Sequence, residues 1–303
     1  MLTVSNYHYI RESYDTKYPS IFGVTPPQFQ NQLQLLKNEG DFISSIDLLA
    51  NLDEALSSKD NFIFITFDDG LKEQFDFALP ILDALEIPAI FFANSRNFQQ
   101  KKASTVHKIH LLRTVLAPSY FLKLLSDFKI SSLSEYDINR AKNIYRFDDE
   151  KSAILKFLLN FKMDFHVQEK IIGNVFELHF EEQQILEEFY MDKKNIVDLA
   201  EKGFLGSHTH NHYPLGLLEK DKIHFELNNS KEYFEKITNS TISIVAYPYG
   251  TDESCTKEVV EVAQVIGYKI GFTTRKGLNF KDINPLMMNR YDCNDLLGGK
   301  NYK

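Results

Sequence analysis

The 303-residue chain has no tryptophan and only two cysteines, Cys255 and Cys293. Two cysteines exclude a disulfide framework and a cysteine-rich zinc site, and they leave open either reduced thiols or a single bridge. No apolar run approaches the length of a membrane span. The segment Met1–His8 has no basic stretch followed by an apolar one, so we expect no signal peptide and a cytoplasmic protein.

Positive charge is also scarce, because the formal net charge is −8, which argues against a nucleic-acid partner. Hydrophobic residues make up 43% of the chain and charged residues 25%, as in ordinary globular proteins. The length allows one large α/β domain or two small ones, with ample material for a core. The composition leaves the oligomeric state open.

An unbroken apolar run, Phe62–Phe67, ends abruptly in Asp68, Asp69 and Gly70. Such a run is typical of a strand that is buried on both faces. Two adjacent carboxylates at the end of a buried strand repel each other, and a bound cation would offset that repulsion. The alternative is turn chemistry that only closes the strand, and this segment alone does not decide between the two.

Two later stretches also lie where an expected strand gives way to a loop. One contains His208, Thr209 and His212, and the other is Tyr247–Gly250. Two histidines four residues apart lie on one face if a helical turn begins there. Together with an acidic strand end elsewhere in the chain, they favour a metal site over a loop without a ligand.

Taken in order, Thr-Phe-Asp-Asp-Gly, His-Thr-x-x-His and Tyr-Pro-Tyr-Gly resemble the polysaccharide deacetylase family, also called the NodB-homology or carbohydrate esterase family 4 group. The resemblance extends from about Val4 to about Asp295. It implies a metal-dependent hydrolase that removes an N-acyl group, most often acetyl, from an amino sugar. Because tryptophan is absent, any platform that stacks on a sugar must be built from tyrosine or phenylalanine.

Strand and helix patterns alternate along most of the chain, which predicts α/β architecture with a parallel sheet, either a barrel or a doubly wound sheet. The resemblance implies a distorted (β/α)7 barrel, with residues 1–303 forming a single NodB-like domain. At about 97–194 the alternation is replaced by helical patterns. We interpret this range as a helical insertion, either a lid or wall beside the substrate or a packing appendage. A last strand is expected near Leu286 to Tyr291.

The resemblance implies that Asp69, His208 and His212 hold a divalent metal. Zinc is the default, and cobalt, nickel or iron would also suit these ligands. It further implies that Asp68 is the general base that deprotonates a metal-bound water, although Asp68 could instead be a second ligand or a helix cap. The backbone N–H of Tyr249 matches the family's oxyanion donor, although an ordinary Pro-Tyr-Gly turn would have the same backbone.

The chain departs from the family pattern at two places. Many members carry an arginine where this chain has Ala246, and many carry a histidine acid near the C-terminus, where this chain has none. Arg290 is either a replacement for the arginine or a surface residue. The candidate proton donors are His8 and His110, or its neighbour His107, and each of these could instead be only structural.

We therefore predict a deacylase that acts on an amino sugar or on a precursor of surface polysaccharide. Two alternatives stay open. One is a catalytically impaired saccharide-binding protein, which the two departures favour. The other is a deacylase for an O-acyl ester, a formamide or a cyclic amide.

Overall fold

The computed structural model describes residues 1–303 except 14, 16, 19–20, 127–132, 147 and 303. The chain forms two compact units. The first, which we call the barrel unit, contains Met1–Ser13, Phe22–Lys102 and Ile185–Lys303. The second, the helical unit, contains Tyr14–Ile21 and Ala103–Gln184.

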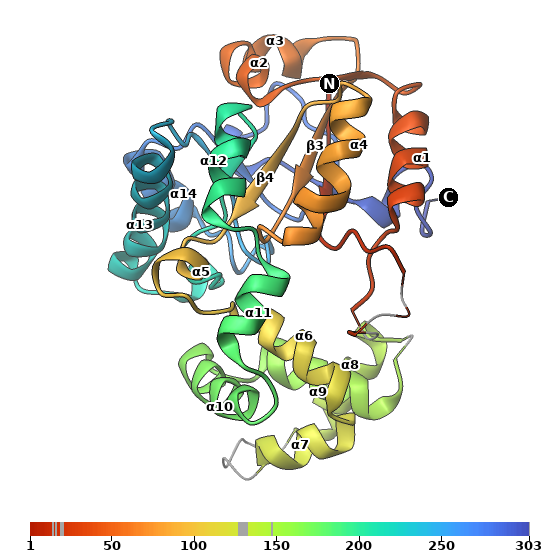
Figure 1. Cartoon of the computed structure of the whole chain (residues 1–303), viewed down its shortest axis with the longest axis vertical. Helices are drawn as coiled ribbons and strands as arrows, with labels where there is room; N and C mark the ends of the chain where they lie inside the picture. The colour runs from red at the N-terminus through yellow and green to blue at the C-terminus, as the bar shows by residue number, and fades with distance from the viewer. Residues whose placement is uncertain (14, 16, 19–20, 127–132, 147, 303) are drawn as a thin grey trace. The chain divides into compact units, whose positions relative to one another are not determined.

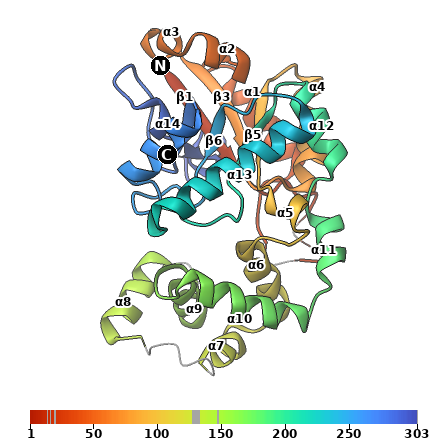
Figure 2. The ribbon, with the colours of Figure 1, turned by 90° about the vertical axis from the view of Figure 1, so that its left-hand side faces the viewer.

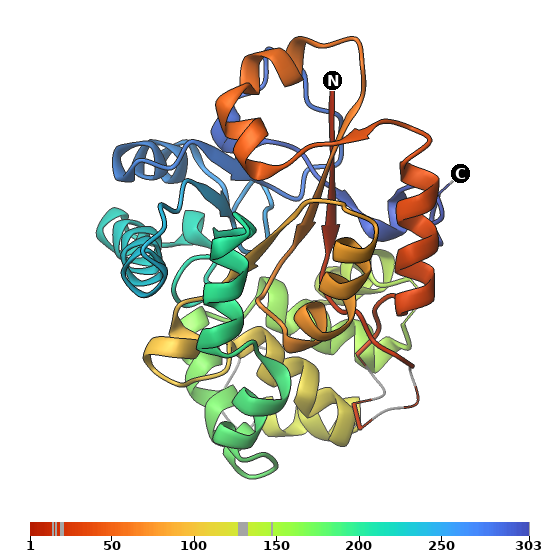
Figure 3. The ribbon, with the colours of Figure 1, turned by 45° about the horizontal axis from the view of Figure 1, so that its top comes forward.

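The barrel unit is built on a parallel sheet with the strand order β7-β6-β5-β4-β3-β1-β8. Its strands are β1 (Leu2–Tyr7), β2 (Asp41–Phe42), β3 (Phe62–Phe67), β4 (Ala89–Ala93), β5 (Leu205–Ser207), β6 (Ile244–Ala246), β7 (Ile270–Phe272) and β8 (Tyr291–Asp292). The short β2 pairs only with the start of β3, at Asp41↔Phe62. Figure 3 shows the strands fanning around a common centre with helices outside them. Because every ladder is parallel, all carboxyl ends point the same way, as the alternation predicts.

The last segment of the chain brings the two ends of the sheet together. Its strand β8 pairs with β1 at Ser5↔Tyr291, and a parallel bridge joins Phe272 of β7 to Met288. This closure confirms the predicted barrel class. The predicted bounds of the last strand were wrong, because residues Pro285–Met287 form a short 3-10 helix, η3, whose first turn is capped by the side chain of Asn284.

Helices cover the outside of the sheet. In the barrel unit these are α1 (Pro26–Leu36), α2 (Ser45–Ala50), α3 (Leu52–Ser57), the π-helix η1 (Gln74–Ala78), α4 (Leu79–Ala84), α5 (Arg96–Gln99), α12 (Lys193–Glu201), η2 (Leu215–Leu217), α13 (Lys220–Thr238), α14 (Lys257–Ile266) and η4 (Cys293–Asp295). Figure 1 shows α4 and α12 beside β3 and β4, and Figure 2 shows α13 passing outside β5 and β6. A capping box formed by Thr25 and Gln28 begins α1.

The side-chain period of two along each strand separates two apolar clusters. One lies between the sheet and the helices and includes Ile63, Ile65 and Phe67. The other fills the barrel interior and includes Phe64 and Phe272, whose ring centroids are 5.7 Å apart. Alternate residues of β3 therefore point into the barrel, and the next inward positions after Phe64 are Thr66 and Asp68.

The same alternation applies to the neighbouring strands. Val4 of β1 and Met288 belong to the interior cluster, so the inward positions at the carboxyl ends are His8 and Arg290. In β5 an added Cβ at Gly206 would lie 2.4 Å from the ring of Phe92, which is also in the interior cluster. His208, two residues later, is the next inward position. Polar side chains that follow β1, β3 and β5, together with Arg290 from the segment before β8, thus converge at one end of the barrel.

Between Ala103 and Gln184, the described residues of the helical unit form helices and no strand. The helices are α6 (Thr105–Val115), α7 (Pro118–Ser126), α8 (Glu135–Ile144), α9 (Glu150–Phe161) and α10 (Phe165–Glu177), while α11 (Glu182–Phe189) begins in this unit and ends in the barrel unit. Whether the chain functions as one domain with an insertion at 97–194 stays a prediction. Among the described residues, we find no helix that combines the length and apolarity of a membrane span.

Candidate active site

The loops at the carboxyl ends of the strands contain several non-glycine residues with left-handed backbone. Asp69 has φ 82°, Thr209 φ 65°, His212 φ 61° and Tyr249 φ 63°. Each such residue costs on the order of 1 kcal/mol or more, and it persists only where its surroundings hold it in place. Strain of this kind is common at functional sites, and four of the seven described non-glycine residues with positive φ lie in the three stretches singled out in the sequence.

Asp69, His208 and His212 come together at this end of the barrel. Asp69 Oδ1 lies 3.4 Å from His208 Nε2 and 3.2 Å from His212 Nε2. One ligand atom from each of the three residues lies within 4.8 Å of the others. Residues more than 130 positions apart therefore present one oxygen and two nitrogens to a common point.

The surroundings of these three residues fit a divalent cation. His208 Nδ1 lies 2.8 Å from the carbonyl oxygen of Ala246, which fixes the ring and leaves Nε2 facing Asp69. Burial lowers the pKa of His208, but Asp68 and Asp69 outweigh it, so the net pKa is raised. Two imidazoles and one carboxylate are a donor set that zinc, cobalt, nickel and iron all accept.

Asp68 is held by Arg290 in a buried two-pronged ion pair. Arg290 Nη1 and Nη2 donate to Asp68 Oδ1 and Oδ2 at 2.7 and 2.8 Å. Arg290 Nε also donates to the carbonyl oxygen of Thr273 at 2.9 Å. Burial raises the pKa of Asp68. The Arg290 guanidinium and neighbouring groups lower it by more than burial raises it, so the net pKa lies below its usual value. At 1% exposure Arg290 is not a surface residue, which removes that alternative.

His8 also lies near Asp68. Its Nε2 is 3.9 Å from Asp68 Oδ2, and 40% of its side chain is exposed. The side chain of Gln74 connects the two residues, because its Nε2 donates to the backbone carbonyls of His8 at 2.8 Å and Asp68 at 2.6 Å. Gln74 carries no signal in the sequence, because it is fully buried at the start of the π-helix η1, a feature that apolar periodicity does not reveal.

Tyr249 lies beside the histidines. Its ring centroid is 5.3 Å from that of His212, and 37% of the residue is exposed. Its carbonyl oxygen accepts a hydrogen bond of 2.8 Å from Thr274 Oγ1. The geometry is compatible with a backbone N–H that serves a bound oxyanion and also with an ordinary turn.

The remaining sequence-predicted residues divide between the two units. His107 and His110 lie in α6 of the helical unit, where His107 is fully buried and His110 is half-buried. Their roles stay predictions. The hydroxyl of Thr209 forms no hydrogen bond within the part of the chain that the structure describes.

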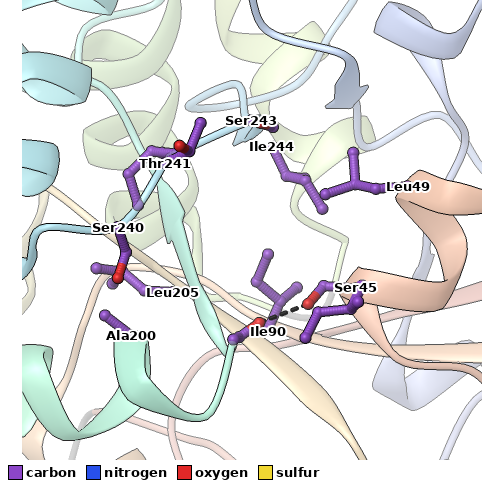
Figure 4. A pocket seen from close by; sticks show the side chains of 12 residues that line it. Ser45, Leu49, Ile90, Ala200, Leu205, Ser240, Thr241, Ser243 and Ile244 are labelled. Atoms are coloured by element: carbon purple, nitrogen blue, oxygen red, sulfur yellow. Dashed lines mark hydrogen bonds between the residues drawn. The ribbon is translucent and has the colours of Figure 1, made fainter.

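A pocket of about 120 Å³ lies at the opposite end of the barrel (Figure 4). It is lined at the amino ends of the strands by Ile90, Leu205 and Ile244, and by Ser45 and Leu49 of α2. None of its twelve lining residues is a histidine or a carboxylate. In barrels of this kind chemistry occurs at the carboxyl ends of the strands, so the pocket is not the active site.

Known proteins resemble this chain in sequence and fold. The family model described as polysaccharide deacetylase matches residues 56–114 and 152–271, more than half of the chain. A provisionally named polysaccharide deacetylase of Bacillus subtilis (strain 168), YxkH, is 26% identical over 102 residues, which span 33% of this chain and 36% of that protein. That match thus covers about a third of the relative's length.

Solved structures share the fold over nearly the whole chain. The Streptococcus pyogenes deacetylase PplD, solved in complex with acetate, has a TM-score of 0.60 at 18% identity, covering 96% of this chain and 91% of that one. IcaB from Ammonifex degensii has a TM-score of 0.57 at 17% identity, covering 95% and 90%. This chain belongs to the polysaccharide deacetylase family.

Proposed function

We propose that this protein is a metal-dependent hydrolase that removes an N-acyl group, acetyl in the first instance, from an amino sugar or a surface-polysaccharide precursor. The observation that carries the proposal is the pairing of two different carboxylates at one strand end. Asp69 faces two imidazoles at 3.2–3.4 Å, while Asp68 is held by Arg290. A ligand cluster beside a separately oriented base is the arrangement that hydrolysis of an amide needs.

Asp69, His208 and His212 would hold the cation, with zinc as the default. When bound, the cation would polarise the acyl carbonyl and make a nearby water more acidic. Asp68 would accept the proton of the attacking water, and its low pKa keeps it ionised for that purpose. Arg290 would keep both carboxylate oxygens in place through its two bonds.

Two further groups would complete the reaction. The backbone N–H of Tyr249 would donate to the oxyanion, and the left-handed backbone at this residue is compatible with that role. His8 would deliver a proton to the leaving amine as the C–N bond breaks, giving a free carboxylic acid and an amino sugar. Its place beside Asp68 and its 40% exposure support this assignment over the candidates in α6.

Arg290 also bears on the alternative of an impaired saccharide-binding protein. That alternative rested partly on the missing arginine, because Ala246 occupies its position in the chain. Arg290, in the segment just before β8, donates to both carboxylate oxygens of Asp68 from a different place in the sequence. The proposed base would therefore have a cationic partner, which favours turnover over binding alone.

The test combines metal binding with turnover. Purified protein, stripped with a chelator and titrated with zinc, should bind about one equivalent and should release acetate from short N-acetylglucosamine oligosaccharides. His8→Asn should retain zinc affinity while kcat falls by about 10²-fold or more, because only the proton donor is lost. Absence of binding of zinc, cobalt, nickel and iron by wild-type protein would refute the proposal. Saccharide binding without release of any acyl group would favour the binding protein instead.

A further inference from the structure

The loop that carries both histidines, which we call the His208–His212 loop, has two left-handed residues, Thr209 and His212. Such a loop does not hold this shape by itself, so the chain around it must hold it in place. On one side the segment after β4 does so. Asn94 Nδ2 donates to the carbonyl oxygen of His208, and the backbone N–H of Ser95 donates to that of Thr209 at 3.2 Å.

On the other side lies Glu226, in the middle of α13. Its Oε2 accepts a hydrogen bond of 2.7 Å from the backbone N–H of Asn211, and its Oε1 accepts one from the side-chain amide of the same residue. The backbone N–H of His210 also faces this carboxylate. One carboxylate thus binds two successive residues of the loop, directly before His212.

Glu226 is an unusual residue for this position because it is 2% exposed. A buried carboxylate costs several kcal/mol unless hydrogen bonds or a nearby cation compensate it. Burial raises the pKa of Glu226, while the bonds from Asn211 and His210 and the charge of Arg96 act against that rise. A polar group kept at this cost, and directed at a ligand-bearing loop, indicates a role beyond packing.

We propose that Glu226 is a positioning residue that fixes the conformation of the His208–His212 loop and thereby sets the affinity of the site for a divalent cation. The proposal rests on the metal site of the proposed function. It adds a residue of α13 that acts through the backbone of Asn211 and does not itself contact the cation. Partners of this kind are worth about 10–100-fold in metal affinity.

The experiment measures zinc affinity by calorimetric titration of chelator-stripped protein, at a temperature where every variant is folded. Glu226→Met keeps the length of the side chain and removes both acceptors, so affinity should fall about 10–100-fold. Glu226→Gln should lose less than about tenfold in zinc affinity, because rotation of the Asn211 amide restores both hydrogen bonds. This rescue would show that the hydrogen bonds, and not the size of the side chain, set the affinity. Glu232→Gln, on an exposed face of α13, is the matched control and should bind zinc as wild type does.

A second variant covers the case in which Glu226→Met does not fold. Asn211→Ala removes only the side-chain bond, so it should weaken zinc binding by less than Glu226→Met. Combining the two should add nothing to Glu226→Met, because both act on one interaction.

The proposal would be overturned if folded Glu226→Met bound zinc as tightly as wild type does. If Glu226→Met does not fold, the proposal would be overturned if Asn211→Ala bound zinc as tightly as wild type does. If the wild-type protein itself bound no zinc, cobalt, nickel or iron, the proposed function would fail instead. The two failures are therefore distinguishable.

Discussion

Asp68 and Asp69 are neighbours in the chain, yet they lie in opposite electrostatic settings. Asp68 points into the barrel and faces the guanidinium of Arg290 at 2.7 Å. Asp69 turns away through a left-handed backbone, with φ 82°, and faces the Nε2 atoms of two histidines. Asp68 is therefore compensated by a cation of the protein itself, whereas Asp69 faces two imidazoles, the proposed co-ligands of a divalent metal.

The difference explains how two like charges can coexist at one strand end. If both carboxylates faced the same cation, they would compete for it, and one pKa would rise. Here the left-handed turn at Asp69 separates their directions. Arg290 keeps the pKa of Asp68 low, so this carboxylate stays ionised, as its proposed role as the base requires.

The sharpest way to break this comparison is to remove the ligand carboxylate. Asp69→Asn should weaken zinc binding by more than about 100-fold, since direct ligands matter more than their supports. Turnover should then fall to background, measured as acetate release. Asp76→Asn, an exposed aspartate of η1, should change neither quantity. Zinc binding unaltered by Asp69→Asn would remove Asp69 from the ligand set.

The neighbouring substitution should separate chemistry from binding. Asp68→Asn should lower kcat by about 10²–10⁴-fold, because an amide cannot accept the proton. Zinc affinity should stay near that of wild type, as measured by the same titration. Full activity in this variant would mean that Asp68 is not the base.

Breaking the ion pair tests the source of the low pKa. Arg290→Met should lower the free energy of unfolding by about 3–5 kcal/mol at neutral pH, because it leaves a buried carboxylate without its partner. The pKa of Asp68 should rise, so the acid limb of the pH–rate profile should move to higher pH. Chemical denaturation and rate profiles would measure the two effects.

The contribution of the Asp68–Arg290 ion pair to the free energy of unfolding should depend on pH in a defined direction. Because the pKa of Asp68 is lowered in the folded state, its contribution is full above the ordinary aspartate pKa and is lost as pH falls through the folded value. The stability gap between wild type and Arg290→Met should therefore narrow in acid. Arg275→Met, which alters a more exposed ion pair with Asp252, should show at most a small gap. A gap that widened in acid would contradict this account.

The smallest effect on activity is expected at Gln74, which donates hydrogen bonds to the backbone carbonyls of His8 and Asp68. Gln74→Leu leaves the carbonyls of His8 and Asp68 without their donor, at a cost of about 1–3 kcal/mol in stability. We expect kcat to fall several-fold with zinc affinity unchanged, because the His208–His212 loop is untouched. Gln34→Leu, at an exposed position of α1, is the control. A change in zinc affinity with kcat unchanged would contradict this expectation and would mean that Gln74 supports the metal ligands instead of Asp68.

Local patterns in the chain predicted most of the helices and strands, and they identified the three stretches that meet at the site. The apolar run Phe62–Phe67 forms β3, and the capping box at Thr25 begins α1. These features depend on residues close in sequence, whose preferences act over one turn or one strand. The last strand was misplaced because Pro285, with the side chain of Asn284, favours a 3-10 turn.

Other features depend on contacts that no local pattern encodes. Arg290 follows β3 by more than 220 residues, and only barrel closure brings its guanidinium to Asp68. Glu226 and Gln74 look like ordinary polar residues of helices until their side chains are seen to be buried against loops. Burial of a polar side chain is set by what packs over it, so sequence-based reasoning had no signal for either residue.

The sequence by itself determined which side chains are present at the strand ends, because strand period and turn chemistry are local. Only the tertiary structure decided which charged or polar partner each of these side chains faces. Closure of the sheet gave Asp68 a cation from the C-terminal segment, and the left-handed turn directed Asp69 toward two imidazoles. Electrostatic partnership depends on distance in space, and distance in space is fixed only when the whole chain has folded.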